Sequence, residues 1–493
     1  MMFSVIMMMF LAQSAHQISH VQPQGYFENE MQFADADGDG DLDLYMAVYT
    51  DNQRFIDIYS QQQNIFSAIP QQHIPVPSGV VAWVVGNFLP SEDGDEIVWL
   101  AARGVYVRNA AGRAQVLSRE PLLLDVPYTF SVPRLNTVAD IDGDGLPEMV
   151  LLTTTGYQII QHDGVVSGEI VVKATDSLAP VAASSLLDGK LRATLSSQEL
   201  SSLFVPNEEM GVLRYPPALF SSVSLPTPIW ADVNGDALLD LTYEKENKLY
   251  VHLQSADYQF SSKAERVFTM PDSSSSSYEQ LEWLNIGGTA AADLLMVRSS
   301  EEALSQTRPW QVRVFLDVWQ QQDLEHSAAV FKAQSTSLGV QLLDINGDDA
   351  LDVCMSNWSL DLGLLGRGSP KLTHIASAFL ANGDSWNKRP SFAERRSINV
   401  DDIESFVTLD SFVPDLTGNG LPDLAELSEK GSLRVRQFDI VNEDVRVASS
   451  ESIDLPIRAL AADVSVKSLN GDEIFDIVIV RSQSLEIYMS VSK

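Results

Sequence analysis

One nine-residue pattern recurs along the chain and limits what the chain can fold into. The clear copies read DADGDGDLD (Asp35 to Asp43), DIDGDGLPE (Asp140 to Glu148), DVNGDALLD (Asp232 to Asp240) and DINGDDALD (Asp344 to Asp352). Two weaker copies read DLTGNGLPD (Asp415 to Asp423) and SLNGDEIFD (Ser468 to Asp476). Apolar runs flank every copy, which indicates repeated structural units joined end to end.

The spacing of these copies predicts the architecture. Three decayed copies, GNFLPSEDGDEIVWL from Gly86, NIGGTAAADLLMV from Asn285 and SLLDGKLRATL from Ser185, bring the total to nine phases. The phases start 46 to 59 residues apart, with one gap of 71 residues. A period of about 40 to 60 residues that contains only short strands is typical of a β-propeller.

Each unit holds enough sequence for four strands. After Asp232 the chain runs LLDLTYEK, KLYVHLQ and RVFTM before LEWLNI leads into the next loop. Alternating apolar residues, with many β-branched and aromatic side chains, identify these segments as strands. We therefore predict an all-β chain, a β-propeller of four-stranded antiparallel blades. Because a decayed phase can be an insertion, we expect seven to nine blades.

The two ends of the chain predict how the ring closes. After Asp476 only DIVIVRS and SLEIYMSV remain, which is enough for two strands. An N-terminal strand over Gln17 to Gln22 would supply the missing outer strand and hide two sheet edges. Residues 16–493 would then form one propeller domain. Residues 1–15, MMFSVIMMMFLAQSA, are uncharged and apolar and end in small residues, as in a signal peptide cleaved after Ser14 or Ala15.

The acids of the repeated loops are predicted metal ligands. Calcium takes about six to eight oxygen ligands and mixes carboxylates with backbone carbonyls. Acids at loop positions 1, 3, 5 and 9 can converge on one ion, and glycine at position 4 or 6 allows the tight turn. Asp, Asn and Gly also make bare turns. Four acids within nine residues, however, repel one another unless a cation lies between them.

The predicted ligands fall into six loops. In the clear copies they are Asp35, Asp37, Asp39, Asp41 and Asp43; Asp140, Asp142, Asp144, Leu146 and Glu148; Asp232, Asn234, Asp236, Leu238 and Asp240; and Asp344, Asn346, Asp348, Ala350 and Asp352, with position 7 offering its carbonyl. In the weaker copies they are Asp415, Thr417, Asn419 and Asp423, and Asn470, Asp472 and Asp476. We expect four calcium ions and at most six, because the weaker copies carry fewer charges. The loop from Asn285, with Gly287 and Thr289 at ligand positions, is expected to be empty.

These loops resemble the calcium hairpins of FG-GAP/VCBS repeats, which occur in integrin α-subunit propellers and in many secreted bacterial proteins. The resemblance spans residues 30 to 490 and rests on the four clear copies. It implies that each loop joins the innermost strand of a blade to the next strand, and that the ion stiffens the loop. The Phe-Gly and Gly-Ala-Pro elements that name the family are missing here. The resemblance therefore implies the scaffold and not the ligand of an integrin.

Charge and missing motifs bound the function. The chain carries 67 acidic and 32 basic residues, a net charge of -35, which repels nucleic acid and anionic lipid. No apolar run reaches the length of a membrane span. The seven histidines form no paired metal motif, and the sequence has no GxSxG or phosphate-binding glycine loop. Cys354, the single cysteine, is predicted to lie in the core.

These observations favour a monomeric calcium-binding module that is secreted, periplasmic or held at the cell surface. We expect it to bind a protein or a glycan on a loop face. Two alternatives stay open. One is a polysaccharide lyase-like enzyme on a calcium-bearing propeller, which would abstract a proton next to a uronate carboxylate. The other is a structural surface component, and the fold alone does not choose among the three.

Overall fold

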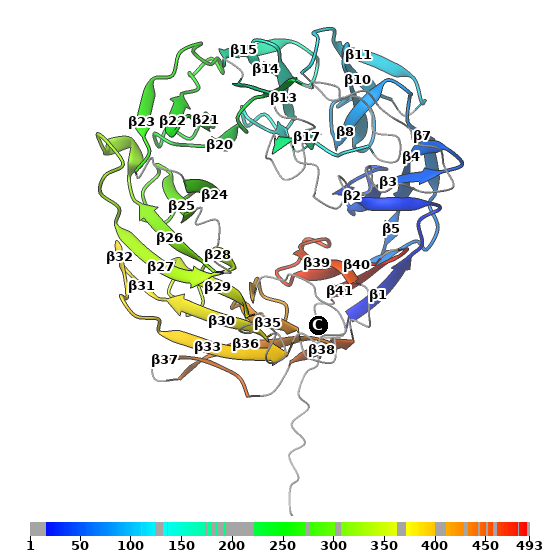
Figure 1. Cartoon of the computed structure of the whole chain (residues 1–493). Helices are drawn as coiled ribbons and strands as arrows, with labels where there is room; N and C mark the ends of the chain where they lie inside the picture. Colours follow the sequence, from blue (N-terminus) through cyan, green and yellow to red (C-terminus); the bar gives the residue numbers. More distant parts are fainter. Residues whose placement is uncertain are drawn as a thin grey trace, which may run out of the picture.

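In the described part of the chain, eight antiparallel sheets of four or five strands are arranged around a common axis (Figure 1). The computed structural model describes residues 16–109, 111–123, 132–135, 137–172, 175–178, 184–185, 192–193, 221–271, 276–300, 307–361, 371–399, 411–427, 432–441, 444–449, 452–456, 461–481 and 483–490. The predicted all-β propeller is confirmed, and eight blades fall within the expected range. The predicted signal peptide, residues 1–15, lies outside the described residues.

The first four blades follow the chain in order. Blade 1 is β2 (Tyr26–Ala34), β3 (Asp43–Thr50), β4 (Gln53–Tyr59) and β7 (Gln72–Pro75). Blade 2 is β8 (Val80–Gly86), β9 (Glu96–Ala101), β10 (Gly104–Arg108) and β11 (Ala114–Ser118). Blade 3 is β12 (Val138–Ala139), β13 (Glu148–Thr153), β14 (Gly156–Ile160) and β15 (Val166–Val171). Blade 4 is β20 (Ile229–Ala231), β21 (Asp240–Lys245), β22 (Lys248–His252) and β23 (Arg266–Thr269).

The remaining blades repeat the same order. Blade 5 is β24 (Ser276–Leu284), β25 (Asp293–Ser300), β26 (Arg308–Phe315) and β27 (Ala329–Ser335). Blade 6 is β28 (Ser337–Leu343), β29 (Asp352–Asp361), β30 (Lys371–Phe379) and β33 (Phe392–Asn399). Blade 7 is β34 (Phe412–Val413), β35 (Asp423–Leu427), β36 (Ser432–Val441), β37 (Asp444–Val447) and β38 (Ile453–Pro456), where β37 and β38 pair with different halves of β36.

Blade 8 closes the ring with both ends of the chain. It contains β39 (Ala461–Lys467), β40 (Asp476–Arg481) and β41 (Leu485–Ser490). Its outer strand is β1 (His16–Val21), which pairs antiparallel with β41 from His16 opposite Ser490 to Val21 opposite Leu485. The predicted closure by an N-terminal strand is confirmed. It removes the free edge that β41 would otherwise expose.

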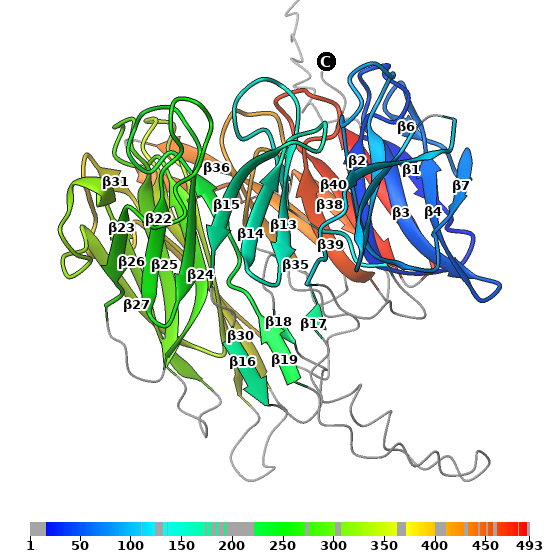
Figure 2. The same ribbon diagram turned by 90° about the horizontal axis from the view of Figure 1, so that it is seen from above.

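The ninth phase does not form a blade in the described residues. Around Ser185 the structure has only the short pair β17 (Ser184–Ser185) and β18 (Arg192–Ala193), beside a second pair, β16 (Thr175–Leu178) and β19 (Ser221–Ser224). Figure 2 shows these strands below the strands of blade 3. The segment keeps the strand–turn–strand shape read from its sequence, but it is an insertion between blades 3 and 4.

Smaller elements complete the described part of the chain. The short pairs are β5 (Gln61–Gln62) with β6 (Ile65–Phe66) and β31 (Ala381–Asn382) with β32 (Ser385–Trp386), and the helical turn is η2 (Val318–Gln320). Helices are therefore few, as predicted. Within the residues described, none of the helices has the length and apolar character that a membrane crossing needs.

The core lies between the blades. Eight clusters of buried apolar side chains each join two neighbouring blades. Tyr45 of β3 and Trp83 of β8, for example, meet between blades 1 and 2, and both are almost fully buried. A blade covered on both faces needs apolar residues on both sides of its middle strands, which explains runs such as IVWL in β9. Cys354 is buried between blades 6 and 7, as predicted.

Candidate functional site

Every blade places an acid at the first residue of its second strand. These residues, called closing acids below, are Asp43, Glu96, Glu148, Asp240, Asp293, Asp352, Asp423 and Asp476. None is more than 6% exposed. Six of them are predicted position-9 ligands, whereas Glu96 and Asp293 belong to decayed copies and were missed. The signal was present, because an acid heads the apolar runs EIVWL and DLLMV as it does in the clear copies.

The closing acids hold the loop backbone in place. In all eight blades the residue at loop position 2 donates its amide to a carboxylate oxygen of the closing acid, at 2.7 to 3.2 Å. In five blades the other oxygen accepts an amide from the end of the third strand or just beyond it, at 2.7 to 2.9 Å. Such charge-assisted bonds tie the loop to the blade whether or not the loop carries the full acidic motif.

Burial raises the pKa of most closing acids. The pKa is about 6 for Asp43 and about 7 for Glu96, Glu148, Asp240, Asp352 and Asp423. Burial is the largest cause, because the ionised carboxylate loses its water, while the donated amides act in the opposite direction. Neighbouring loop acids raise the pKa further. A divalent cation in the loop would favour the ionised form.

The aspartate at loop position 1 shapes the turn. Asp35 accepts the amides of Gly38 at 2.7 Å and Gly40 at 2.9 Å, and Asp140 repeats the pattern with Gly143 and Gly145. Asp232, Asp344 and Asp415 each accept the same pair of amides, three and five residues later. The donor residues adopt left-handed backbone angles, including Ala237 with φ of 68° and Asp349 with φ of 64°. The predicted need for glycine therefore holds at position 4 and is relaxed at position 6.

Two of the four clear copies bring three carboxylates together. Ligand atoms of Asp140, Asp142 and Glu148 lie within 4.8 Å of one another, and so do those of Asp35, Asp37 and Asp39. In blade 3 the Oε1 atom of Glu148 is also buried without a hydrogen-bond donor. Leaving such an oxygen bare is costly, and hard cations prefer this type of ligand. The donor set of blade 3 therefore fits calcium.

The remaining predicted ligands keep the same loop order. At position 7 the amides of Asp41, Leu146, Leu238 and Ala350 donate to the position-5 residues Asp39, Asp144, Asp236 and Asp348, at 2.8 to 3.0 Å. In blades 4 and 6 position 3 is asparagine, and Asn234 and Asn346 donate their side-chain amides to the position-5 carboxylate at 2.9 Å. At positions 1, 3, 5 and 9 these two loops carry three acids each, one fewer than the loops of blades 1 and 3.

Hydroxyl groups contact the closing acid in the two weaker copies. In blade 7 Thr417 Oγ1 donates to Asp423 at 3.1 Å, and Asn419 Oδ1 accepts the amide of Leu421. In blade 8 Ser490 Oγ donates to Asp476 at 3.0 Å. Asn470 bonds Asp472, whose other oxygen accepts the amide of Ile474. Among the clear copies, only blade 3 leaves the corresponding oxygen, Oε1 of Glu148, without a hydrogen-bond partner.

The loop from Asn285 is closed by its own hydrogen bonds. Asn285 donates to the carbonyl of Thr289 at 2.7 Å. The closing acid Asp293 accepts the amides of Ile286 at 2.8 Å, Gly287 at 2.7 Å and Asp317 at 2.7 Å. Both of its carboxylate oxygens are therefore in use. The loop also lacks the acids that the clear copies carry at positions 1 and 5, and the expectation that it is empty remains a prediction.

Three pairs of neighbouring loops are bonded to each other, in blades 1 and 2, blades 4 and 5, and blades 7 and 8. The amide that precedes the closing acid of one blade donates to the carbonyl of loop position 1 in the previous blade. This bond joins Asp95 to Asp35 at 2.5 Å, Ala292 to Asp232 at 2.8 Å and Phe475 to Asp415 at 2.9 Å. A shift in the backbone of one loop therefore also displaces the backbone of the loop bonded to it.

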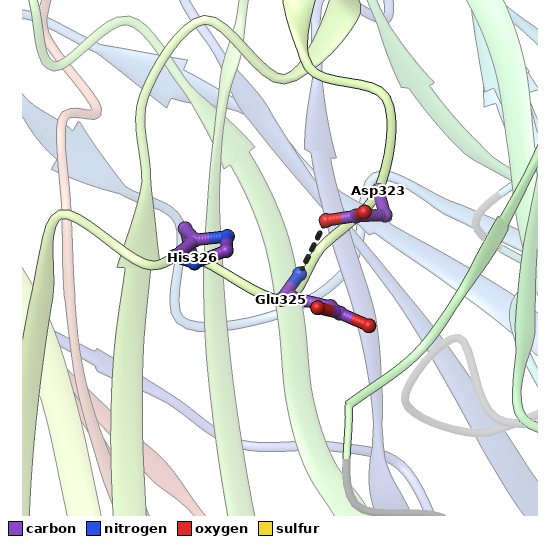
Figure 3. A group of neighbouring side chains, drawn as sticks. All are labelled: Asp323, Glu325 and His326. Carbon is purple, nitrogen blue, oxygen red and sulfur yellow. Dashed lines mark hydrogen bonds between the residues drawn. The ribbon is translucent and has the colours of Figure 1, made fainter.

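A further group of possible ligands lies outside the repeated loops. Asp323, Glu325 and His326 occupy one exposed loop before β27, with ligand atoms within 4.8 Å of one another. Figure 3 shows the three side chains along this loop, where the amide of Glu325 donates to Asp323. All three are exposed, so water already solvates them. The burial that distinguishes Glu148 in the blade 3 loop is missing here.

Two other features complete the described surface and core. A cleft of about 560 Å³ involves blades 5 and 6 and is lined by Gln311, Arg313, Val330, Phe331, Lys332, Phe379, Lys388 and Pro390. Its basic side chains stand out in a chain of net charge -35. Between blades 6 and 7, His374 Nε2 contacts the hydroxyls of Ser356 at 3.0 Å and Ser411 at 2.7 Å. These three residues are buried, so the cluster is structural, as expected for a core histidine.

Comparisons with known proteins add the fold alone. No family model matches the chain, and no curated protein matches it. Among solved structures, the chain is similar to the Dos1 propeller, with 9% identity, a TM-score of 0.41 and 95% of each chain covered. It is also similar to the exotype rhamnogalacturonan lyase YesX, with 10% identity, a TM-score of 0.35, and 96% of this chain and 76% of that chain covered. Neither likeness is close enough to support an argument about function.

Proposed function

We propose that the chain is a secreted, calcium-binding β-propeller of the FG-GAP/VCBS type that binds a protein or a glycan. Blade 3 carries the proposal. Asp140, Asp142 and Glu148 bring three ligand atoms within 4.8 Å of one another, and the buried Oε1 of Glu148 has no donor. Burial also raises the pKa of Glu148 to about 7, which a bound cation would reverse.

The residues of the blade 3 loop would hold the ion together. Asp140, Asp142, Asp144 and Glu148 offer carboxylate oxygens, and Leu146 offers its carbonyl. When bound, calcium supplies positive charge that offsets the repulsion among these acids. Asp140 also holds the turn through two backbone amides, so the ion and the turn depend on each other. The chemistry that this site supports is stiffening of the loop.

Calcium removal tests the metal part of the proposal. An ion that binds only the folded chain stabilises it by about 2.7 kcal/mol per site when its free concentration is 100 times the Kd. We expect the melting temperature to fall in a chelator and to recover when calcium is added back. Asp140→Ala should remove one part of this response and keep the rest. Asn285→Ala, at the same loop position of blade 5, is the matched control and should leave the response unchanged.

A melting curve that is the same in chelator and in calcium would refute the metal assignment. The same conclusion would follow if Asp140→Ala and Asn285→Ala responded to calcium alike. Far-ultraviolet circular dichroism checks that each variant is folded, since a variant that fails to fold gives no calcium response of its own.

A ligand screen tests the binding part of the proposal. A rigid ring of blades presents loops and clefts on a fixed scaffold, which suits recognition of a large partner. Arrays of glycans and of surface proteins should give hits with the calcium-loaded chain. A paired Lys332→Glu and Lys388→Glu variant asks whether the basic cleft between blades 5 and 6 takes part. Absence of any hit, together with cleavage of a uronate polymer, would instead favour the lyase alternative. Recovery of the chain in stoichiometric surface assemblies would favour a structural role.

A further inference from the structure

The loop of blade 2 departs from the acidic motif but keeps its frame. It runs from Asn87, which follows β8, to the closing acid Glu96, and it is one residue longer than the nine-residue copies. The sequence NFLPSEDGDE has no aspartate at its first position, so the motif alone assigns no ion to it. Gly94, the eighth residue of this loop, adopts a left-handed angle, φ of 82°, whereas the left-handed glycine that all clear copies share is at position 4. Phe88, at position 2, still donates its amide to the closing acid, so the loop keeps its tie to the blade.

This loop leaves two buried acceptor oxygens without a donor. Glu96 is 6% exposed, and its Oε2 atom accepts the amides of Phe88 and Leu89, each at 2.9 Å. Its Oε1 atom and the Oδ1 atom of Asn87 are both buried and have no hydrogen-bond partner. Because Phe88 follows Asn87 directly and contacts Glu96, the two bare oxygens belong to the same short stretch of the loop. A buried acceptor oxygen that nothing binds is costly, because it has lost its hydrogen bonds to water and gained none in return.

The other loops show what this signature means. Among the described copies of the nine-residue loop and their closing acids, one further buried oxygen lacks a donor, Oε1 of Glu148, in the blade 3 loop where three ligand atoms converge. The loop from Asn285 has no such oxygen, because both carboxylate oxygens of Asp293 accept amides and Asn285 is exposed. The signature thus distinguishes the two loops closed by glutamate, in blades 2 and 3, from the loops of blades 1, 4, 5, 6 and 8, where both oxygens of the closing aspartate accept amides. By this criterion blade 2 belongs with blade 3.

We propose that the blade 2 loop binds a hard divalent cation, calcium, through Asn87 Oδ1 and Glu96 Oε1. Loop carbonyls and water would complete the shell of about six to eight oxygens. The inference rests on the proposed function and extends it, because it adds an ion site to a loop that lacks the acidic motif. The loop is bonded to its neighbour, because Asp95 donates its amide to the carbonyl of Asp35 and accepts the amide of Asp35 at 3.1 Å. An ion here would therefore act on the loop of blade 1 as well.

Counting bound ions tests this site. Native mass spectrometry of the full chain at neutral pH, titrated with calcium, should show one ion fewer in Glu96→Gln and in Asn87→Leu than in the parent chain. Leucine matches the size of asparagine and removes only the polar atoms, so Asn87→Leu serves if Glu96→Gln fails to fold. Asn285→Leu makes the same substitution at the same position of blade 5 and should keep the full number of ions.

Each outcome separates the two proposals. An unchanged ion number in both blade 2 variants overturns this site and leaves the motif loops untouched. A parent chain that binds no calcium at all overturns the proposed function together with this inference. The competing explanation is a proton shared between Glu96 and Asn87. It predicts that the ion number stays constant, while the stability difference between Glu96→Gln and the parent chain changes with pH in the absence of calcium.

Discussion

Replacing Asp293 by alanine should destabilise the chain without any involvement of calcium. Asp293 is fully buried at the start of β25. Its carboxylate accepts the amides of Ile286, Gly287 and Asp317 at 2.7 to 2.8 Å. Alanine leaves these three donors without an acceptor. The loop from Asn285 would then lose its tie both to the second strand and to the segment after β26.

The size of the loss follows from these three bonds. A hydrogen bond to a charged group contributes about 1.5 to 3 kcal/mol. The low end applies, because water entering the space left by the carboxylate would satisfy part of the exposed amides. We therefore expect a loss of about 4 to 5 kcal/mol in the free energy of unfolding. Since whole domains are stable by about 5 to 15 kcal/mol, this is a large fraction of the total.

Urea unfolding followed by tryptophan fluorescence measures the loss. Trp283 is 7% exposed and stands in β24 just before the loop, so its emission should change when the blade opens. The experiment is run in saturating calcium and again in a chelator, and the loss should be the same in both. Asp323→Ala is the control: its exposed carboxylate accepts one amide, from Glu325 at 3.0 Å, and its removal should cost less than about 0.5 kcal/mol. A loss below about 1 kcal/mol for Asp293→Ala, or one seen only with calcium, would refute the role assigned to the closing acids.

Two further predictions concern single residues. Ala237 has a φ of 68°, a strained angle for a residue with a Cβ. Ala237→Gly should therefore raise the free energy of unfolding by about 0.5 to 1 kcal/mol, a figure that already allows for the larger entropy of glycine in the unfolded chain. Urea unfolding checks it, and a loss of stability would contradict the strain. Burial, reinforced by Arg396 and opposed by Glu394, lowers the pKa of His374 to about 4. Below about pH 6.5 the unfolded chain therefore takes up a proton at this histidine while the folded chain does not. Between pH 7 and pH 4 the free energy of unfolding of the parent chain should therefore fall by about 3 kcal/mol relative to that of His374→Gln. Parallel pH profiles of the two free energies would contradict the lowered pKa.

Most of the fold could be predicted because the spacing of the motif copies gives the length of each repeated unit. Alternating apolar runs and the two-strand remainder after Asp476 were enough to predict four-stranded blades and closure by an N-terminal strand, which β1 provides. The blade number was left open because a strand–turn–strand pattern such as that at Ser185 reads the same in a blade and in an insertion. Only long-range pairing separates the two, since β17 bonds β18 alone among the described strands.

The candidate site was predicted less completely, for a physical reason. Spacing assigned the last acid of each copy to a metal, and the structure shows that this acid also accepts backbone amides in all eight blades. Both roles need a carboxylate at the same position, so the pattern cannot distinguish them. Asp293 keeps the structural role in a loop that has lost the other acids. The unpartnered oxygens of Glu96 and Asn87 could not be predicted, because a missing hydrogen-bond donor is visible only in the three-dimensional structure.

The bonds between loops would couple three pairs of neighbouring blades in their response to calcium. Blade 2 reaches the loop of blade 1 through Asp95, and blade 5 reaches the loop of blade 4 through Ala292. Each bond uses the amide next to a closing acid, so a loop that shifts moves both its own strand and the carbonyl of its neighbour. Loops closed by their own bonds, such as that of Asp293, would then support adjoining loops whose acids need an ion. The mixture of metal-dependent and metal-independent loops would keep the ring closed when calcium is scarce, while leaving its stability sensitive to the ion.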